Sequence, residues 1–488
     1  MADLPVVRSV GAAQWCCPPS AGIVYLRLLS RLIVSFAATA LPGYALAANG
    51  CADGTYSRVQ SPDRNSTSFL FDDFSATAGG SSGISRASST CRLSVPVTQA
   101  EGHSVFAVDY RGYVSTQPGQ AASVVMLKDG RAVVLQDITL PTDDDLSFSQ
   151  RIGSSGSNIV ELDVVVGATG APDPGLSDAI IFLDSIDLAR IGFTTTEAVV
   201  ESANQVARQR QSIAVGLMDS ALSLLGQTNR FDDGNSVSGF ASSDAAAGFA
   251  GRWEAGDGLS LLAGAAIIDP NEIDNVSDTL ALFAAAVRFT TAPSQWRAFG
   301  EVGAWASPNV SASLSRSYSN LNSTNFGVGS SSGYLFASYA RAGLIFAPDE
   351  INEFALSTRI SRSWLDLDGY EEAVSPDNLF AAQMKPGRSI ADTISAELAW
   401  SRSLSETFDF TVFGAAGRTF ARKNGVSASV DWVGDVRGTA DDQNFGSVAG
   451  RVGWKFTQGW QADLSVSATF RETEKPAWNI GGQLKSTF

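Results

Sequence analysis

The chain has 488 residues, a formal net charge of −16, 46 glycines, four cysteines and a single histidine. This length exceeds that of one ordinary domain, and the acidity argues against nucleic acid as a partner. Only 17% of the residues are charged, and abundant glycine, alanine, serine and aromatic residues favour many short strands over helical packing.

Residues 1–48 have the pattern of an export signal. Arg27 and Arg31 precede the apolar run Leu32–Ala40, and Ala45–Ala47 supplies the small residues of a cleavage site. The apolar run is too short for a transmembrane helix. We therefore expect residues 1–48 to be a signal peptide that is removed on export.

Residues 49–193 are predicted to form a β-sandwich, because short alternating segments are separated by turn residues at close intervals. We expect a hairpin around Lys128–Gly130 in addition to five other strands. These expected strands are Thr67–Thr77, Cys91–Thr98, Val105–Ser115, Ile159–Gly167 and Ala179–Phe193.

Two cysteines follow the expected cleavage site, Cys51 and Cys91. Two cysteines in an exported chain favour one disulfide, which would stabilise the domain by about 3–4 kcal/mol. The alternative is two free thiols, which an oxidising compartment disfavours.

Residues 194–234 are predicted to be helical. Thr194 is the expected N-cap and Glu197 the third helical residue of a capping box, and the following segment to Leu225 contains no proline. The first half of this segment is too polar to face lipid. It is either a surface helix or linker, or a helix threaded through a water-filled barrel lumen.

Two arginines of this helix, Arg208 and Arg210, are expected to face polar groups of the surrounding wall. Glu301 and Glu397 are examples of the acidic wall groups that they are expected to face. The alternative, which is equally compatible with the sequence, is that both arginines are solvated on an exposed linker.

Residues 235–488 are predicted to form a closed antiparallel transmembrane β-barrel. Segments of about ten residues alternate apolar and polar side chains, as between Trp460 and Arg471, with aromatic residues near their ends. Short connections alternate with longer ones, as periplasmic turns and extracellular loops do, and about twelve strands result if the first is Asn235–Ala241. The longer connections are expected at 269–277, 308–332, 366–389, 422–444 and 472–476.

The last strand ends at Phe488, and Leu484 and Ile480 lie on the same face. A terminal phenylalanine on an alternating strand resembles the signal that the outer-membrane barrel-assembly machinery reads. Ser486 departs from the aromatic residue usual two positions before the end.

The helix, the strand number and Phe488 together resemble the translocator of an autotransporter, over about residues 194–488. This resemblance implies outer-membrane lipid and the barrel-assembly machinery as partners, and type V secretion of the upstream segment. The N-terminal part resembles a family of small secreted β-domains of unknown function, which also supports pairing of its cysteines. The matching segments are Cys51, Phe71–Phe74, Cys91–Leu93 and Asp109–Tyr113.

Candidate catalytic and metal-binding residues are scarce. His103 is the only histidine, Ser81 lies in a G-x-S-x-G match without the required strand–turn–helix context, and Asp143–Asp145 could bind Ca²⁺ or form a solvated acidic turn. Zinc spacings, a P-loop and a dinucleotide fingerprint are absent from the sequence. We therefore expect no enzymatic activity, no cofactor and no metal.

The function expected from these patterns is display of the N-terminal domain at the surface of a Gram-negative cell, where it binds an unidentified extracellular ligand. Two alternatives remain at this stage. The N-terminal domain could be a hydrolase, or it could stay in the periplasm below a porin-like barrel.

Overall fold

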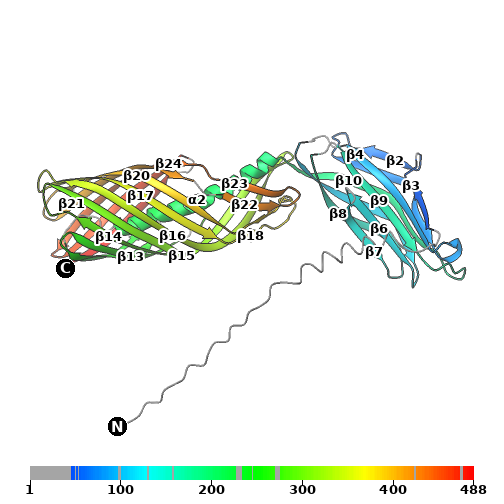
Figure 1. Cartoon of the computed structure of the whole chain (residues 1–488), viewed down its shortest axis with the longest axis horizontal. Coiled ribbons are helices and arrows are strands. Elements are labelled where there is room, and N and C mark those ends of the chain that lie inside the picture. Colours follow the sequence, from blue (N-terminus) through cyan, green and yellow to red (C-terminus); the bar gives the residue numbers. More distant parts are fainter. Residues whose placement is uncertain are drawn as a thin grey trace, which may run out of the picture.

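Figure 1 shows the computed structural model, in which two stacked sheets are followed by one long helix and by a barrel that surrounds much of that helix. The described residues are 45–49, 51–52, 54–96, 101–128, 131–156, 159–226, 234–243, 246–269, 275–421, 425–472 and 476–488. The predicted fold class, a β-sandwich-like domain, a helix and a twelve-stranded antiparallel barrel, is confirmed.

The N-terminal part is a sandwich of two five-stranded sheets, in the orders β1-β4-β9-β6-β7 and β2-β3-β10-β5-β8. Most strands alternate buried and exposed residues, so each sheet turns an apolar face toward the other. Phe74 and Tyr110 from one sheet and Leu162 from the other are fully buried between them. The strands are β1 (Ala45–Asn49), β2 (Tyr56–Gln60), β3 (Ser66–Ala78), β4 (Arg86–Pro96), β5 (His103–Thr116), β6 (Ala121–Lys128), β7 (Arg131–Ile138), β8 (Thr142–Ser155), β9 (Ile159–Thr169) and β10 (Ala179–Thr194), with the short 3-10 helix η1 (Gly80–Ser82) after β3.

Strand β1 overlaps the expected cleavage site. It pairs in parallel with β4, with Ala45 opposite Arg86 and Asn49 opposite Thr90. Cleavage near Ala47 would remove most of this strand, so that only Ala48 and Asn49 would remain paired with β4. Removal of the signal peptide stays a prediction.

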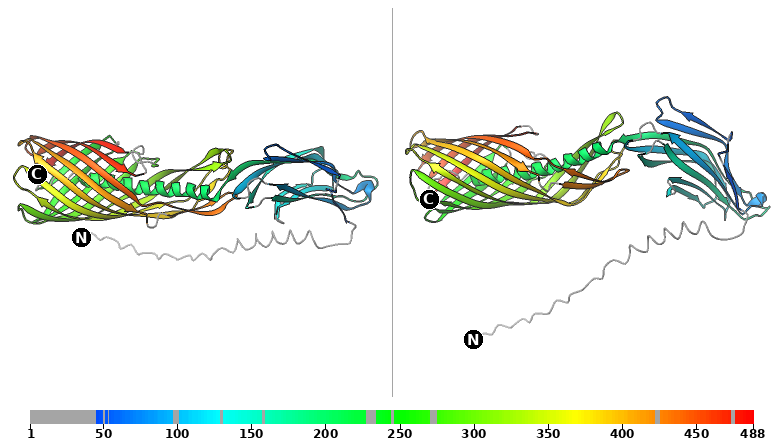
Figure 2. Two further views of the ribbon diagram at one scale, coloured as in Figure 1. Left: turned by 90° about the horizontal axis from the view of Figure 1, so that it is seen from above. Right: turned by 45° about the horizontal axis from the view of Figure 1, so that its top comes forward.

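The helix α2 (Thr196–Gly226) contains 31 residues, which corresponds to a length of about 46 Å. Figure 2 shows that it runs from the N-terminal sandwich into the barrel. No helix among the described residues is both long and apolar enough to cross a bilayer.

The C-terminal part is a closed barrel in which each strand pairs with its neighbours and β11 pairs with β26. Because β11 lies beside the last strand, the sheet has no free edge within the barrel. The strands in order are β11 (Ser236–Ser242), β12 (Ala247–Gly256), β13 (Leu259–Ile268), β14 (Leu280–Thr290), β15 (Trp296–Asn320), β16 (Ser323–Phe346), β17 (Asn352–Leu367), β20 (Gly387–Ser403), β21 (Phe408–Phe420), β24 (Gln443–Thr457), β25 (Trp460–Arg471) and β26 (Ala477–Thr487).

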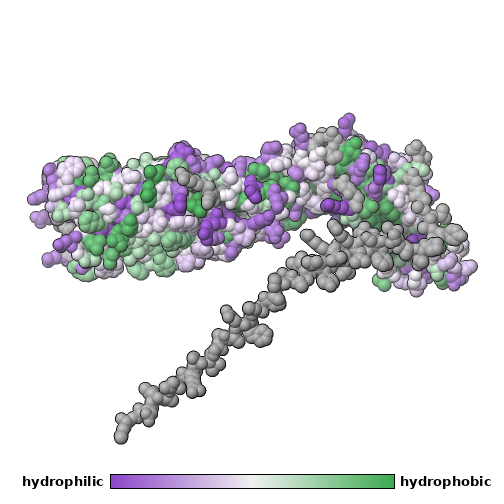
Figure 3. All heavy atoms as spheres, in the orientation of Figure 1, coloured by the Kyte–Doolittle hydropathy of each residue, from purple (hydrophilic) through white to green (hydrophobic). Residues whose placement is uncertain are grey.

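The outer surface of the barrel is apolar. On the face in Figure 3, green and pale residues prevail over the barrel wall and purple ones at its short-turn end on the left. An outward apolar wall is stable in lipid and costly in water, so this surface identifies a transmembrane barrel. Its exposed side chains include Leu261, Val302, Leu344, Leu356, Ile360, Leu398, Val452 and Leu464.

Two rows of aromatic residues bound this wall. Near the short turns, Trp296, Phe346, Phe354 and Trp400 lie opposite one another across four neighbouring strands. Aromatic rings of this kind favour the two boundaries between lipid and water.

The second row lies near the other end of the wall. Phe336 stacks on Trp364, with ring centroids 5.5 Å apart, and is opposite Ala306 in β15. Ala306 is ten residues beyond Trp296 on the same strand. At about 3.4 Å per residue and a tilt of about 40°, the two rows are about 25 Å apart, which matches the apolar band of an outer-membrane barrel.

Beyond the second row, strands continue where the sequence predicted loops. The hairpin of β15 and β16 extends to Asn320 and Ser323, so the loop expected at 308–332 is wrong. The expected loops at 366–389 and 422–444 contribute a four-stranded sheet. Its strands are β18 (Tyr370–Glu371), β19 (Ala382–Met384), β22 (Gly425–Val430) and β23 (Gly434–Thr439), and we call this sheet and the outer part of the β15–β16 hairpin the extension.

Candidate functional site

The N-terminus of α2 differs by one residue from the sequence prediction. Thr195 is the N-cap, because its Oγ1 accepts a hydrogen bond from the Ala198 N–H at 3.2 Å. Thr194, the predicted cap, is the fully buried last residue of β10. Glu197 lies exposed in the first turn, where a negative charge complements the helix dipole. The capping box predicted for Thr194 and Glu197 is therefore wrong.

The helix is packed against the barrel wall over much of its length. Val206, Ile213 and Leu217 of α2 are fully buried, in one cluster with wall residues such as Leu282 and Leu335. Of the two predicted alternatives, the helix threaded through the barrel lumen is confirmed, and along this stretch it packs directly against wall side chains. The helix is therefore an integral part of the barrel interior.

Glutamines of α2 bind the free edge of β15 in the extension. Ser317 donates its backbone N–H to Gln205 Oε1 at 2.8 Å, and Ser315 donates its own to Gln209 Oε1 at 3.0 Å. The Gln209 amide nitrogen in turn donates to the Ser315 carbonyl oxygen at 2.8 Å. These amides replace the neighbouring strand that β15 lacks here.

The opposite flank of α2 contacts the edge of β23. Asn204 Oδ1 accepts a hydrogen bond from the Thr439 N–H at 2.8 Å, while its amide nitrogen donates to Glu201 at 2.9 Å. At Gly438, a Cβ atom would lie only 2.2 Å from the Ala203 carbonyl carbon, so glycine permits this close approach. The helix therefore closes a seam between β15 and β23.

A buried ion pair fixes the helix within the extension. Arg316 of β15 and Glu372 are both almost inaccessible to solvent, and two hydrogen bonds of 2.8 and 2.7 Å join them. Arg316 also donates to Ser202 Oγ of α2 at 3.2 Å and to the Phe380 carbonyl oxygen. Asn378 donates to Glu372 at 3.2 Å. One guanidinium thus connects the helix, the long hairpin and the segment between β18 and β19.

The wall carboxylates expected to face the helix bind other arginines. Glu301 is 2.5 Å from Arg288, and Tyr339 also donates to it at 2.6 Å. Glu397 accepts from Arg341 at 2.8 Å and from Arg359 at 3.0 Å.

The two helix arginines have different surroundings. Arg208 contacts Glu201 of its own helix at 2.5 Å, whereas Arg210 is 1% exposed. The predicted contacts of Arg208 and Arg210 with Glu301 and Glu397 are therefore wrong.

Several contacts attach the N-terminal sandwich to the extension. Phe193 donates its N–H to Asn320 Oδ1 at 2.8 Å and accepts a hydrogen bond from the Leu321 N–H at 3.0 Å. The Trp432 ring packs on Gly153 of β8, where a Cβ atom would lie 2.6 Å from the ring. These contacts join the end of the central strand β10 and the edge strand β8 to the outer end of the barrel.

The single histidine lies at this junction. His103 Nε2 is 3.2 Å from Thr196 Oγ1, and its Nδ1 is buried. Partial burial lowers the pKa of His103, and a backbone contact with Trp432 opposes that effect. His103 thus contacts the first residue of α2 rather than a reactive serine.

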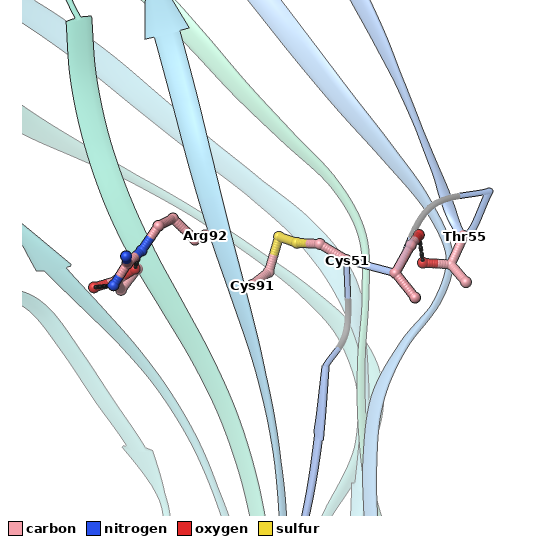
Figure 4. The surroundings of a disulfide bond; sticks show 6 residues. Cys51, Thr55, Cys91 and Arg92 are labelled. Atoms are coloured by element: carbon pink, nitrogen blue, oxygen red, sulfur yellow. Dashed lines mark hydrogen bonds and ion pairs between the residues drawn. A yellow bond between two sulfur atoms is a disulfide. The ribbon is translucent and has the colours of Figure 1, made fainter.

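The disulfide joins Cys51 to Cys91, as Figure 4 shows, with Cα atoms 5.0 Å apart. Cys91 is fully buried in β4, whereas Cys51 follows β1. The bond fastens the N-terminal segment to the core of the sandwich.

The residues expected to form the barrel-assembly signal lie on the outer face of the last strand. Ile480, Leu484 and Phe488 are all exposed, and the Phe488 N–H donates to the Asn235 carbonyl oxygen at 3.1 Å. The carboxyl end therefore lies beside the start of β11, at the end with the short turns.

The remaining candidate residues have structural partners. Ser81 lies in η1 and donates to Asp178 at 3.2 Å. Asp143–Asp145 belong to β8 rather than to a turn, and Tyr113 donates a short hydrogen bond to Asp143. This contact lowers the pKa of Asp143. Within the described ranges, no group of three or more His, Cys, Asp or Glu side chains could hold a metal ion.

Comparison with known sequences gives matches to the N-terminal part. Residues 41–127 match the family model of a domain of unknown function, DUF4360. A segment of 79 residues is 34% identical to an uncharacterized secreted protein of Arthroderma benhamiae, covering 16% of this chain and 32% of that protein. The chain thus spans about a third of the length of this relative.

Comparison with solved structures gives matches to the barrel. The translocator domain of the autotransporter NalP from Neisseria meningitidis has a TM-score of 0.40 and 12% identity, covering 59% of this chain and 100% of that one. LpxR from Salmonella typhimurium has a TM-score of 0.29 and 11% identity, covering 52% and 100%. The Pseudomonas putida toluene transporter TodX has a TM-score of 0.30 and 12% identity, covering 55% and 91%. Both expected resemblances recur here, but such low TM-scores add nothing on function to the geometry described above.

Proposed function

We propose that the chain is an autotransporter-type outer-membrane protein, whose barrel carries the N-terminal sandwich to the cell surface and anchors it there. The path of α2 is the single observation that carries this proposal. The helix begins at the sandwich, beside the extension, and leads to β11, whose Ser236 lies opposite Thr487 at the short-turn end. The chain therefore passes lengthwise through the barrel.

The dimensions of the barrel support transport of an unfolded chain. A lumen filled by one helix is about 10–12 Å wide, which is far too narrow for two stacked sheets about 10 Å apart with their side chains. The sandwich would therefore cross before it folds and assemble outside. α2 follows last and closes the lumen.

We propose further that the displayed sandwich binds an extracellular ligand and has no enzymatic activity. Its candidate nucleophile Ser81 and its histidine contact Asp178 and Thr196 respectively, and not each other. Cells with and without residues 49–193 would be compared for attachment to surfaces and for hydrolysis of chromogenic esters and peptides. A hydrolytic activity that is lost in Ser81→Ala or His103→Gln would favour the hydrolase alternative.

Protease treatment of intact cells tests the display. An epitope would be inserted in the exposed turn at Asp63, with a matched insertion at Asp349 in a short turn of the barrel. Display requires loss of the first epitope, while the second stays protected until the outer membrane is permeabilised. If the Asp63 epitope also becomes sensitive only after permeabilisation, the sandwich is periplasmic and the porin-like alternative is correct.

A further inference from the structure

Arg210 is a buried cation for which the described residues provide no carboxylate partner. Its side chain is 1% exposed, and its Nε and Nη2 atoms have no hydrogen-bond partner among the described residues. The wall carboxylates Glu301 and Glu397 bind Arg288, Arg341 and Arg359. The helix thus brings a positive charge into the barrel interior that these carboxylates do not neutralise.

The surroundings of Arg210 offer hydrogen-bond donors and apolar contacts. A Cβ atom at Gly387, the first residue of β20, would lie 3.5 Å from Arg210 Nη1. Ser389 follows on the same face of β20, and its hydroxyl is buried without a partner in the described structure. On the neighbouring strand, Leu367 and Leu365 lie opposite Gly387 and Ser389, and both are fully buried.

A second hydroxyl comes from the extension. Tyr370 is buried, its OH has no partner among the described residues, and Arg210 and Tyr370 interact electrostatically. The carboxylate whose charge reaches Arg210 is Asp366, which instead binds Arg388 on the half-exposed outer face at 2.8 Å. Ser389 and Tyr370 can each donate an O–H hydrogen bond, and Asp366 points to another arginine.

A buried guanidinium without a counterion is unfavourable, because it loses its hydration and gains no ion partner in return. We propose that Arg210, together with the hydroxyls of Ser389 and Tyr370, binds a small inorganic anion of the chloride type inside the barrel. Two guanidinium N–H groups and two O–H groups suit a monatomic anion, which accepts hydrogen bonds from any direction. The low dielectric of the packed interior strengthens the attraction.

This anion would connect three elements: α2, β20 and the start of the extension. It would hold the helix in the lumen independently of how the sandwich reached its place, so the inference does not depend on the proposed function. Removal of the anion would leave Arg210 as an uncompensated charge at the helix–wall contact.

The test uses the purified full chain, folded in detergent. Crystals soaked in bromide are expected to give an anomalous peak within hydrogen-bond distance of Arg210 Nη2. Replacing gluconate by chloride at constant ionic strength is expected to raise the thermal midpoint by roughly 2–4 °C. Arg210→Met should abolish both effects, whereas the matched variant Arg208→Met, on the same helix but half-exposed, should retain both.

Tyr370→Phe keeps the charge and is a second variant if Arg210→Met does not fold. It should shift the chloride dependence to at least threefold higher concentration. A bromide map without a peak at Arg210, together with a midpoint that is independent of chloride, would overturn the proposal in favour of solvation by water. A chloride effect that persists unchanged in Arg210→Met would overturn it as well, because the anion would then act elsewhere.

Discussion

Gln205 of the helix accepts a hydrogen bond from the backbone N–H of Ser317 at 2.8 Å, at an edge of β15 that has no neighbouring strand. An unpaired strand edge exposes donors and acceptors that readily pair with another chain. One turn further along α2, Gln209 binds the edge in the same way at Ser315. Residues four apart on a helix thus match residues two apart on a strand, and this spacing lets the helix take the place of a strand.

The first prediction concerns this seam. In Gln205→Leu/Gln209→Leu, we expect α2 to separate from β15, because the partly buried N–H groups of Ser315 and Ser317 would lose their acceptors, at a cost of up to about 1–3 kcal/mol each. Planar-bilayer recordings should then show a larger ionic conductance than the wild type. Glu197→Gln, an exposed change in the first turn of the same helix, should keep the wild-type conductance. A closed channel in the double variant would mean that apolar packing alone closes the lumen.

The second prediction concerns the buried pair Arg316–Glu372. Arg316→Met and Glu372→Met should each lower the free energy of unfolding by about 3–5 kcal/mol, because each leaves one buried charge unpaired. The double variant Arg316→Met/Glu372→Met should be more stable than either single variant. Denaturant unfolding in detergent measures all of these values in one double-mutant cycle.

The exposed pair Lys385–Asp435, at 3.0 Å, is the matched control for that cycle. Its removal should change the free energy of unfolding by less than about 1 kcal/mol, because solvent screens both charges. Equal changes in the free energy of unfolding for the two pairs would contradict the prediction that burial makes the Arg316–Glu372 pair the more costly one to break.

The barrel strands could be predicted because lipid enforces strict alternation of their side chains. Where β15 and β16 leave the membrane, the alternation continues, with Val310, Ala312 and Leu314 buried, but serine and glycine, which are frequent in loops, occupy most of the other positions. This composition therefore predicts a loop at 308–332, although the segment is part of a continuous hairpin. Asp143–Asp145 likewise suggest a turn, although pairing with β5 makes them part of strand β8.

The ion pairs of the site could not be predicted, because strand register decides them. Arg288 lies directly opposite Glu301, and this pairing leaves no carboxylate for the helix. Arg359 lies opposite Arg341, and Glu397 on the next strand bridges both. Sequence shows which charges face the lumen, but a change of two residues in register would exchange their partners.

The third prediction concerns the disulfide. Cys51→Ser/Cys91→Ser removes a crosslink between residues 40 apart, so the sandwich should lose about 4 kcal/mol of unfolding free energy. The barrel should be unaffected, since the bond lies wholly within the sandwich. Limited proteolysis of purified protein would follow the sandwich, and heat-modifiable migration on gels would follow the barrel. Loss of both signals together would show that the two parts fold as one unit.

The fourth prediction is a pH dependence at the junction. Burial lowers the pKa of His103 below its ordinary value of 6.5, so the open form of the junction binds the proton more readily than the closed form. The stability that neutral His103 contributes to the closed junction is fully present above about pH 6.5. This stability declines as the pH falls below that value, and the decline continues through the lowered pKa. Relative to the intrinsic exchange rate, hydrogen exchange at Phe193 and Thr196 should accelerate in the wild type as the pH falls through this range. In His103→Gln, the exchange rate corrected in the same way should not show this acceleration. A pH profile identical to that of the wild type would assign the effect to another group.

The last prediction separates recognition of the barrel from its stability. Phe488 lies beyond the end of β26 with a 72% exposed side chain, and its backbone N–H bond to Asn235 does not need the ring. Phe488→Ala should therefore lower the amount of assembled barrel in cells but leave the unfolding free energy of refolded protein within about 0.5 kcal/mol of the wild type. Ile480→Arg, which places a charge on the lipid face, should lower that free energy in lipid vesicles by about 1–3 kcal/mol. Equal losses in vesicles for both variants would mean that Phe488 acts as a lipid contact, and normal assembly of Phe488→Ala in cells would remove it as a signal.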